Sequence, residues 1–130
     1  LALLETLNGG KPLVNATNGD IPSAAGCVAW FVEAIDKIYG EVGPTDASML
    51  AIAVREPVGV VGAVVPWNFP LSMAAWKFAP ALAAGNSVIL KPAEQSPYTA
   101  LRIAELAVEA GIPAGIFNVL SGYGETAGQA

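Results

Sequence analysis

The sequence predicts an α/β fold in which short buried strands alternate with helices around a parallel sheet. Three apolar runs, at residues 58–65, 87–90 and 116–120, have the length and the β-branched content of strands. Two longer segments, at 71–84 and 97–110, lie between these runs and have the length of helices. Because parallel strands need a crossover connection, which is usually a helix, the order β-α-β-α-β predicts a parallel sheet.

Two helices are predicted before the sheet. Residues 1–7 are followed by an Asn-Gly-Gly sequence, whose residues tolerate the left-handed conformation that is common at helix ends. Residues 21–39 place apolar side chains at three- and four-residue steps, which predicts one apolar helix face. We expect Asp20 to cap this second helix at its amino end.

A hairpin is predicted between the second helix and the sheet. A glycine-proline pair within residues 41–46 marks a turn. The side chains of residues 49–56 alternate as in a strand, which we expect to pair with residues 39–42. The helices and this hairpin arm make up residues 1–56, ahead of an α/β segment at 57–130.

The first strand of the sheet leads into a polar side chain. We expect residues 58–65 to be buried on both faces, as central strands of parallel sheets are, and Pro66 to end the hydrogen bonding of the strand. Pro70 suits the first turn of a helix, so Asn68 lies between the strand and the helix. This is the carboxyl end of a strand, where open α/β sheets bind ligands.

The local pattern allows two interpretations of Asn68. Its side-chain oxygen could accept a hydrogen bond from a free backbone N–H of the following helix, as an N-cap does. Its amide could instead donate to a substrate oxygen, as the amides of oxyanion holes do.

Polar and glycine-rich residues also follow the other two strands. Lys91 comes directly after the second strand and could bond a ribose hydroxyl, with Glu94 accepting from the neighbouring one; otherwise both are solvated loop charges. Gly124 and Gly128 follow the third strand, where a nucleotide must approach the backbone closely. Ser96 is expected to cap the helix that follows it. Three such loops on one sheet edge are typical of a nucleotide site.

The motif Pro66-Trp67-Asn68-Phe69-Pro70 resembles the motif at this place in the aldehyde dehydrogenase superfamily. Three other stretches are similar to that family in the same order and spacing: Arg-Glu-Pro-Val-Gly-Val at 55–60, Ala-Leu-Ala-Ala-Gly-Asn at 81–86 and Lys-Pro-Ala-Glu-Gln-Ser-Pro at 91–97. The resemblance covers nearly all of the chain. Within the family, residues 34–42 and 125–130 look most like the γ-glutamyl-γ-aminobutyraldehyde dehydrogenase branch, with betaine aldehyde dehydrogenases as close alternatives.

The resemblance implies a partial Rossmann-like sheet and a role for each candidate residue. Asn68 would be a catalytic residue that supplies half of an oxyanion hole, while Lys91 and Glu94 would hold the adenosine ribose. The cofactor-binding residues that it implies are Val64, Pro66, Trp67, Lys91, Glu94, Gly124 and Gly128. The implied cofactor is NAD, with NADP possible, because the Glu94 carboxylate would repel a 2′-phosphate.

The implied reaction is NAD(P)-dependent oxidation of a small-molecule aldehyde to a carboxylic acid through a cysteine thiohemiacetal. In the family the nucleophile and the general base come from later segments, so residues 57–130 would be an incomplete NAD-binding domain. We therefore expect an enzyme fragment that turns over no aldehyde by itself, and a homo-oligomer joined through the hairpin arm in the full-length enzyme. A non-catalytic nucleotide-binding module is the alternative.

The charge and residue composition argue against three classes of binding partner: nucleic acids, metal ions and membranes. The net charge is −5 and the six Lys and Arg residues are spread singly, which argues against a nucleic-acid surface. The chain has no histidine and one cysteine, so we expect no metal site. Prolines break the apolar run between Pro57 and Leu90 into pieces of strand and helix length, which argues against a membrane span.

The lone cysteine, Cys27, is expected to pack against the core, because a reactive cysteine needs a nearby base or cation. With no internal disulfide and no visible signal peptide, we expect a cytoplasmic protein. Hydrophobic residues make up 54% of the chain and charged residues only 13%. That charged share is low for a domain that stands alone, so we expect part of the apolar surface to pack against further protein.

Overall fold

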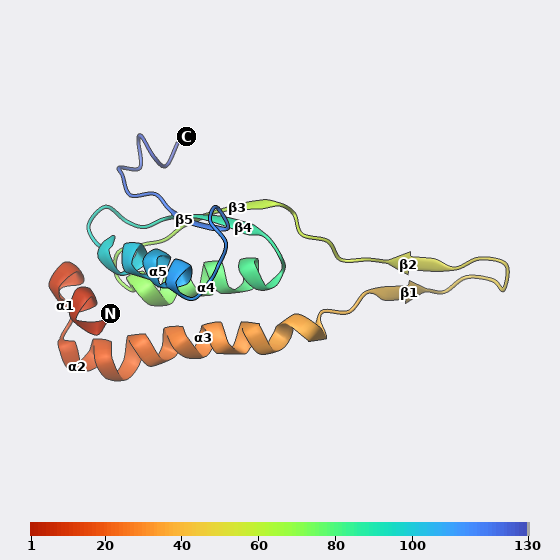
Figure 1. The fold of residues 1–130 in the computed structure, drawn as a ribbon, viewed down its shortest axis with the longest axis horizontal. Helices are drawn as coiled ribbons and strands as arrows, with labels where there is room; N and C mark the ends of the chain where they lie inside the picture. Colours follow the sequence, from red (N-terminus) through yellow and green to blue (C-terminus); the bar gives the residue numbers. More distant parts are fainter. Residues whose placement is uncertain (130) are drawn as a thin grey trace.

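The computed structural model describes residues 1–129 and has the predicted α/β fold (Figure 1). Residue 130, the last of the predicted cofactor-binding segment, lies outside the described range. The elements in chain order are α1 (Ala2–Gly9), α2 (Leu13–Asn15), the π-helical turn η1 (Ala16–Asp20), α3 (Ile21–Ala34), the 3-10 turn η2 (Ile35–Lys37), β1 (Glu41–Gly43), β2 (Ala51–Ala53), β3 (Val60–Val64), α4 (Pro70–Ala83), β4 (Ser87–Lys91), α5 (Tyr98–Glu109) and β5 (Phe117–Val119).

Strands β3, β4 and β5 form a sheet in that order, and both pairings are parallel. Val64 lies opposite Lys91, and Val88 lies opposite Phe117. Helices α4 and α5 connect the strands and lie on the same side of the sheet, with α3 beyond them (Figure 1). The predicted β-α-β-α-β order and the parallel sheet are therefore confirmed.

The prediction that the first strand is buried on both faces is wrong. Ala63 and Val65 are buried, whereas Val60 is 67% exposed and Val64 is 68% exposed. Side chains alternate between the two faces of a strand, and both connecting helices cover the same face. No element among residues 1–129 covers the other face, so an apolar sheet surface remains open to solvent.

The hydrophobic core lies between the sheet and the helices. Phe78 of α4 and Phe117 of β5 pack with ring centroids 4.9 Å apart. Helix α3 contributes Ala24 and Val28 to the same cluster, so the N-terminal helices and the sheet segment share one core. Cys27 is half-buried against this cluster, which confirms the packing role expected of it.

The second helical region begins earlier than predicted. Helix α2, η1 and α3 follow one another without a break from Leu13 to Ala34. Asp20 has helical backbone angles and makes no capping bond, because the N–H of Ile21 already donates to Ala16 O inside the helical path. The prediction of Asp20 as N-cap is therefore wrong, and its carboxylate instead pairs with Lys11 Nζ at 2.5 Å.

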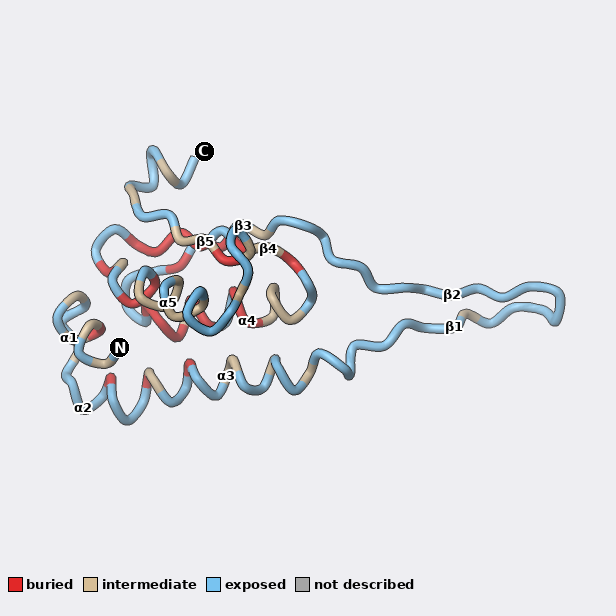
Figure 2. Tube along the Cα trace, viewed as in Figure 1, coloured by how far each residue is buried: buried red, intermediate tan, exposed pale blue. Residues whose placement is uncertain are grey.

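Strands β1 and β2 form the predicted hairpin, with Val42 opposite Ile52 in an antiparallel pair. Both strands are shorter than expected, and β1 occupies part of the segment that we expected to form the turn. The arm projects far from the core (Figure 1) and is exposed along nearly its whole length (Figure 2). Val42 is 70% exposed and Ile52 is 60% exposed, so the arm presents apolar side chains to solvent.

Within the part of the chain that the structure describes, every helix is too short or too polar to cross a membrane. Residues 1–129 also bring together no group of three or more His, Cys, Asp or Glu side chains that could hold a metal ion.

Candidate functional site

The loops that follow the strands of the sheet gather at its carboxyl edge, because β3, β4 and β5 all run in the same direction. The N–H of Val65 donates to Lys91 O at 3.1 Å, so the loops after β3 and β4 start side by side. The N–H of Leu120 donates to Leu90 O at 2.9 Å, which brings the loop after β5 to the same edge. The structure thus collects the predicted site residues from three separate segments.

Asn68 is exposed in the turn between β3 and α4. Helix α4 begins at Pro70 with Phe69 as its N-cap residue, and no side chain within this turn makes a capping hydrogen bond. The N-cap interpretation of Asn68 is therefore wrong. No hydrogen bond joins the Asn68 side chain to any other of residues 1–129, so its amide remains free to donate to a ligand.

Side chains from distant parts of the chain hold this turn on both sides of Asn68. Ser96 Oγ donates to Trp67 O at 3.3 Å. Lys11 Nζ lies 3.9 Å from the centre of the Phe69 ring, a cation–π contact. After Asn68, the N–H of Leu71 donates to Glu5 Oε1 at 3.1 Å. The turn is therefore anchored to α1, to the segment after α1 and to the loop after β4.

Glu5 is a site residue that sequence analysis did not single out. Nothing around it in the sequence predicts burial of a carboxylate, since both of its partners lie far along the chain. Its side chain is 2% exposed and accepts from Leu71 and from Thr99 Oγ1, the latter at 2.6 Å. Such a contact can be found only once α1 is placed against the first turns of α4 and α5.

Lys91 and Glu94 lie together at the end of β4. Lys91 Nζ donates to Pro92 O at 3.1 Å and lies 3.6 Å from Glu94 Oε2. The Lys91 side chain is 9% exposed, whereas that of Glu94 is 38% exposed. A nearly buried ammonium beside a half-exposed carboxylate offers a donor and an acceptor at one place, the arrangement that two neighbouring hydroxyls can satisfy.

The remaining candidates from the first strand lie on the uncovered side of the sheet edge. Val64 ends β3 opposite Lys91, and its side chain is 68% exposed. Pro66 is also exposed, and Trp67 is 59% exposed. These three exposed side chains form an apolar surface next to the Lys91–Glu94 pair.

The loop after β5 is a compact turn around one carbonyl group. The N–H groups of Ala127 and Gly128 donate to Tyr123 O at 2.9 and 3.4 Å. A Cβ on Gly128 would lie 2.5 Å from Gly124 O, so the fold itself requires glycine at 128. A Cβ on Gly124 would meet nothing within 4 Å, so this backbone is open to a ligand.

Ser96 does not cap α5 as predicted. Its hydroxyl donates to Trp67 O, while the N–H of Tyr98, the first residue of α5, donates to Asn8 Oδ1 at 2.9 Å. Asn8 Nδ2 also donates to Gln95 O at 3.2 Å. The prediction of Ser96 as N-cap is wrong because Asn8 of α1 accepts the hydrogen bond from the first N–H of α5. The Ser96 hydroxyl instead holds the loop that contains Trp67.

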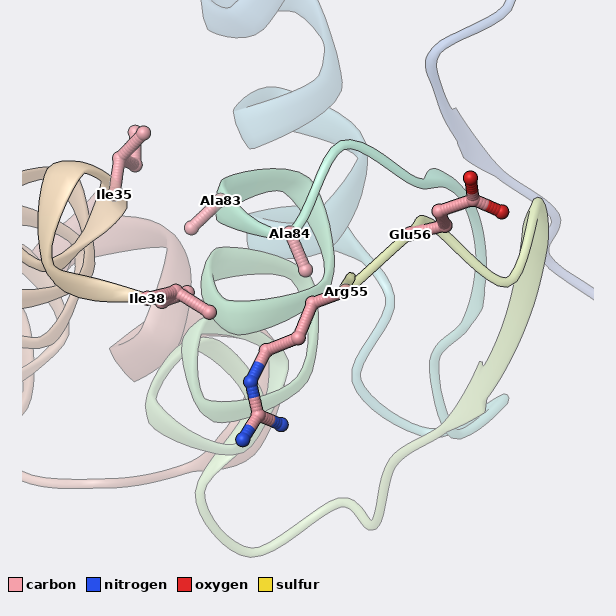
Figure 3. A pocket seen from close by; sticks show the side chains of 6 residues that line it. All are labelled: Ile35, Ile38, Arg55, Glu56, Ala83 and Ala84. Atoms are coloured by element: carbon pink, nitrogen blue, oxygen red, sulfur yellow. The ribbon is translucent and has the colours of Figure 1, made fainter. Parts of the chain in front are cut away.

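Two hollows flank α4 at opposite ends. One, of about 480 Å³, lies near the carboxyl end of α4 and contains none of the predicted site residues (Figure 3). Its walls are formed by Ile35, Ile38, Arg55, Glu56, Ala83 and Ala84. The other, of about 500 Å³, lies at the amino end, between Phe69 and the segment from Lys11 to Asp20. Only the second hollow adjoins the turn that carries Asn68.

Comparison with known proteins agrees with this geometry. Residues 1–130 match the model of the family described as "Aldehyde dehydrogenase family". The NADP/NAD-dependent aldehyde dehydrogenase PuuC of Escherichia coli (strain K12) is 61% identical over 130 residues, which are 100% of this chain and 26% of that protein. The chain thus spans about a quarter of the length of the curated relatives that it matches.

Solved structures give the same result. The crystal structure of γ-glutamyl-γ-aminobutyraldehyde dehydrogenase from Burkholderia cenocepacia is 66% identical and superposes with a TM-score of 0.93, covering 95% of this chain and 25% of that one. PnpE in complex with nicotinamide adenine dinucleotide is 50% identical with a TM-score of 0.97, covering 99% of this chain and 26% of that one. The predicted resemblance to the aldehyde dehydrogenase family is therefore confirmed, and the similar proteins include a γ-glutamyl-γ-aminobutyraldehyde dehydrogenase.

Proposed function

The chain belongs to the aldehyde dehydrogenase family, and we propose that it is the part of an NAD(P)-dependent enzyme that supplies the oxyanion-binding amide and one side of the cofactor site. The observation that carries this proposal is the Asn68 amide, which is exposed at the carboxyl edge of a parallel sheet and has no hydrogen-bond partner among residues 1–129. An exposed amide that does not cap the helix is available to stabilise charge on a substrate oxygen.

The residues at this edge fit NAD. Lys91 and Glu94 present a donor and an acceptor suited to the two hydroxyls of a ribose. Gly124 leaves open the backbone that a pyrophosphate or an adenine would approach, and the exposed Trp67 offers an apolar wall. NAD supplies a hydride acceptor when it is bound. Glu94 favours it over NADP, since a 2′-phosphate would lie near a carboxylate.

Asn68 acts on the carbonyl oxygen of the aldehyde. When a thiolate attacks the carbonyl carbon, a negative charge develops on that oxygen, and the Asn68 amide donates a hydrogen bond to it. The thiohemiacetal oxyanion would become a thioester by giving its hydride to NAD⁺, which Lys91 and Glu94 would help to hold. Water then hydrolyses the thioester to the carboxylic acid and releases the thiol. The net reaction converts aldehyde, NAD⁺ and water into acid, NADH and a proton.

The attacking thiolate comes from a cysteine outside residues 1–130. Cys27 is half-buried against the core, and burial raises the pKa of its thiol. With no histidine in the sequence, no imidazole of this chain can take up its proton. Cys27 therefore lacks what a nucleophile needs.

The hollow beside Phe69 is the place proposed for the body of the aldehyde. It adjoins the turn of Asn68 and is lined by polar residues of the segment from Lys11 to Asp20 as well as by the Phe69 ring. Because the solved γ-glutamyl-γ-aminobutyraldehyde dehydrogenase is 66% identical to this chain, that aldehyde is the substrate to assay first.

The hairpin arm is proposed to join subunits of a homo-oligomer. Its apolar side chains, including Val42, Leu50 and Val54, are 70–72% exposed on a projection that has no core of its own. Covering such side chains is the usual role of a subunit interface. We place the enzyme in the cytoplasm, where a half-buried free thiol such as Cys27 stays reduced.

The proposal is tested by aldehyde-dependent reduction of NAD, measured for the purified 130-residue chain and for the full-length enzyme. The mass of the short chain is checked against 13.2 kDa. We expect NADH from the full-length enzyme and none from the short chain, because the nucleophile is missing. NADH from the short chain would contradict the incomplete site and would make Cys27 the residue to replace.

The alternative function, a nucleotide-binding module without catalysis, rests on the Lys91–Glu94 pair alone. It predicts that a full-length protein binds NAD but forms no NADH with any aldehyde. Measuring NAD binding in parallel with turnover separates the two functions.

A further inference from the structure

Glu5 carries a carboxylate that the proposed reaction does not use, although it is the most buried acidic side chain near the site. It is 2% exposed. A single oxygen, Oε1, accepts from the N–H of Leu71 at 3.1 Å and from the hydroxyl of Thr99 at 2.6 Å. Burying a carboxylate costs free energy unless it is hydrogen-bonded, so the Leu71 N–H and the Thr99 hydroxyl stabilise the buried Glu5 side chain.

The two donors belong to the first turns of two different helices. Leu71 is the second residue of α4 and follows Asn68 by three positions. Thr99 is the second residue of α5 and follows Glu94 by five positions. One carboxylate oxygen therefore joins the segment that carries the oxyanion-binding amide to the segment that carries the ribose-binding pair.

We propose that Glu5 is a positioning residue that fixes the Asn68 amide relative to the Lys91–Glu94 pair. This inference rests on the proposed function of Asn68. The N–H of Leu71 is one of the free donors of a helix amino end, where a negative side chain is favourable. Because Thr99 holds the same oxygen, Glu5 cannot follow a shift of the turn without breaking a buried hydrogen bond. The turn consequently has one low-energy position.

Asn8 provides a matched control on the same helix. It caps α5 through the N–H of Tyr98 and donates to Gln95 O, and within residues 1–129 it makes no hydrogen bond to α4 or to the turn. Asn8→Ala removes hydrogen bonds between α1 and α5 as Glu5→Ala does, yet leaves the Leu71 contact in place. A purely structural role of α1 would make the two variants behave alike.

The experiment is a double-mutant cycle in the full-length enzyme with NAD and an aldehyde, combining Glu5→Ala with Asn68→Ala. In the presence of Asn68, Glu5→Ala is expected to lower kcat about tenfold to hundredfold, as small misplacements of catalytic groups do, with little change in the KM for NAD. In the Asn68→Ala background the same change is expected to lower kcat less than about twofold, since no amide remains to be placed. Asn8→Ala is expected to leave kcat unchanged.

Two conservative variants separate position from charge. Glu5→Gln keeps an oxygen that can accept both hydrogen bonds and is expected to retain nearly the full kcat. Glu5→Asp keeps the charge, but its side chain is one methylene shorter and does not reach both donors, so it is expected to behave like Glu5→Ala. These variants also serve if Glu5→Ala does not fold.

Amide hydrogen exchange across residues 66–72 gives a readout that does not need turnover. Glu5→Ala is expected to speed exchange in this peptide, while Asn8→Ala is not. If the unmodified enzyme forms no NADH, the proposed function fails and exchange still tests the role of Glu5. Equal losses of kcat in both backgrounds, or unchanged exchange at 66–72, would overturn the inference.

Discussion

The hydroxyl of Ser96 donates a hydrogen bond to the backbone carbonyl of Trp67 at 3.3 Å. Trp67 directly precedes Asn68, and Ser96 lies two residues after Glu94 in the loop that follows β4. Ser96 is 1% exposed, so water does not readily replace this contact. The bond ties the loop that carries Asn68 to the loop that carries Lys91 and Glu94.

Ser96→Ala is expected to destabilise the enzyme by about 1 kcal/mol, the typical net value of one hydrogen bond. The change should lower the Tm in thermal unfolding. Ser48→Ala is the control, since the Ser48 hydroxyl makes an exposed contact to Asp46 in the hairpin, and such surface changes usually cost less than about 0.5 kcal/mol. Equal Tm values for the two variants would show that the Ser96 contact contributes nothing.

Asn68→Ala in the full-length enzyme is expected to lower kcat about a hundredfold to a thousandfold, the usual cost of one oxyanion donor. The KM for NAD should change little, because the proposed partner of the amide is the substrate oxygen and not the cofactor. The measurement is steady-state kinetics with NAD and aldehyde varied in turn. Asn118→Ala is the control, because within residues 1–129 this amide donates to Gly115 O alone. A variant with normal kcat and weakened NAD binding would assign Asn68 to the cofactor instead.

Glu94→Ala is expected to relax the choice between NAD and NADP. Removing the carboxylate beside Lys91 leaves an ammonium that can attract a 2′-phosphate. The ratio of kcat/KM for NAD to that for NADP should fall about tenfold, equivalent to about 1.4 kcal/mol. Glu105→Ala, which removes a surface partner of Arg102 on α5, should leave the ratio as it is. The prediction fails if Glu94→Ala lowers both values equally.

The two candidate glycines are expected to respond differently to alanine. Gly128→Ala places a Cβ 2.5 Å from Gly124 O, so the turn must move and the Tm should fall. Gly124→Ala meets nothing within 4 Å, so the Tm should stay unchanged while NAD binding weakens where the cofactor approaches the backbone. Thermal unfolding and NAD titration of both variants test this. Unaltered NAD affinity in Gly124→Ala would remove Gly124 from the cofactor site.

Cys27→Ala is expected to leave turnover unchanged, because the thiol packs against the core. Burial raises the pKa of the Cys27 thiol above that in the unfolded chain. The stability that the protonated Cys27 thiol contributes is therefore fully present below its pKa in the unfolded chain. This stability is lost as the pH rises through the higher pKa of the thiol in the folded protein. Unfolding measured from about pH 8 to pH 10 should show a smaller loss of stability for Cys27→Ala than for the unmodified enzyme. A large fall in turnover would contradict the packing role.

The order and the type of the elements in the sheet segment could be predicted from the sequence. Runs of β-branched residues, helix-length segments and the prolines around Asn68 are local signals, and each places its element within a few residues of the observed one. The parallel direction of the strands follows from the helices between them. That alone brings the loops after β3, β4 and β5 to one edge, so the candidate site could be located without coordinates.

The contacts at the amino ends of α4 and α5 were decided only by the tertiary structure. Asn8, and not Ser96, accepts the hydrogen bond from the first N–H of α5. Glu5, and not Asn68, accepts the hydrogen bond from the N–H of Leu71 in the first turn of α4. Glu5 and Thr99 are 94 residues apart in the chain, and a hydrogen bond over such a separation leaves no periodic trace in the sequence. Likewise, the exposed face of β3 reflects where α4 and α5 pack, which depends on the whole sheet rather than on the apolar run itself.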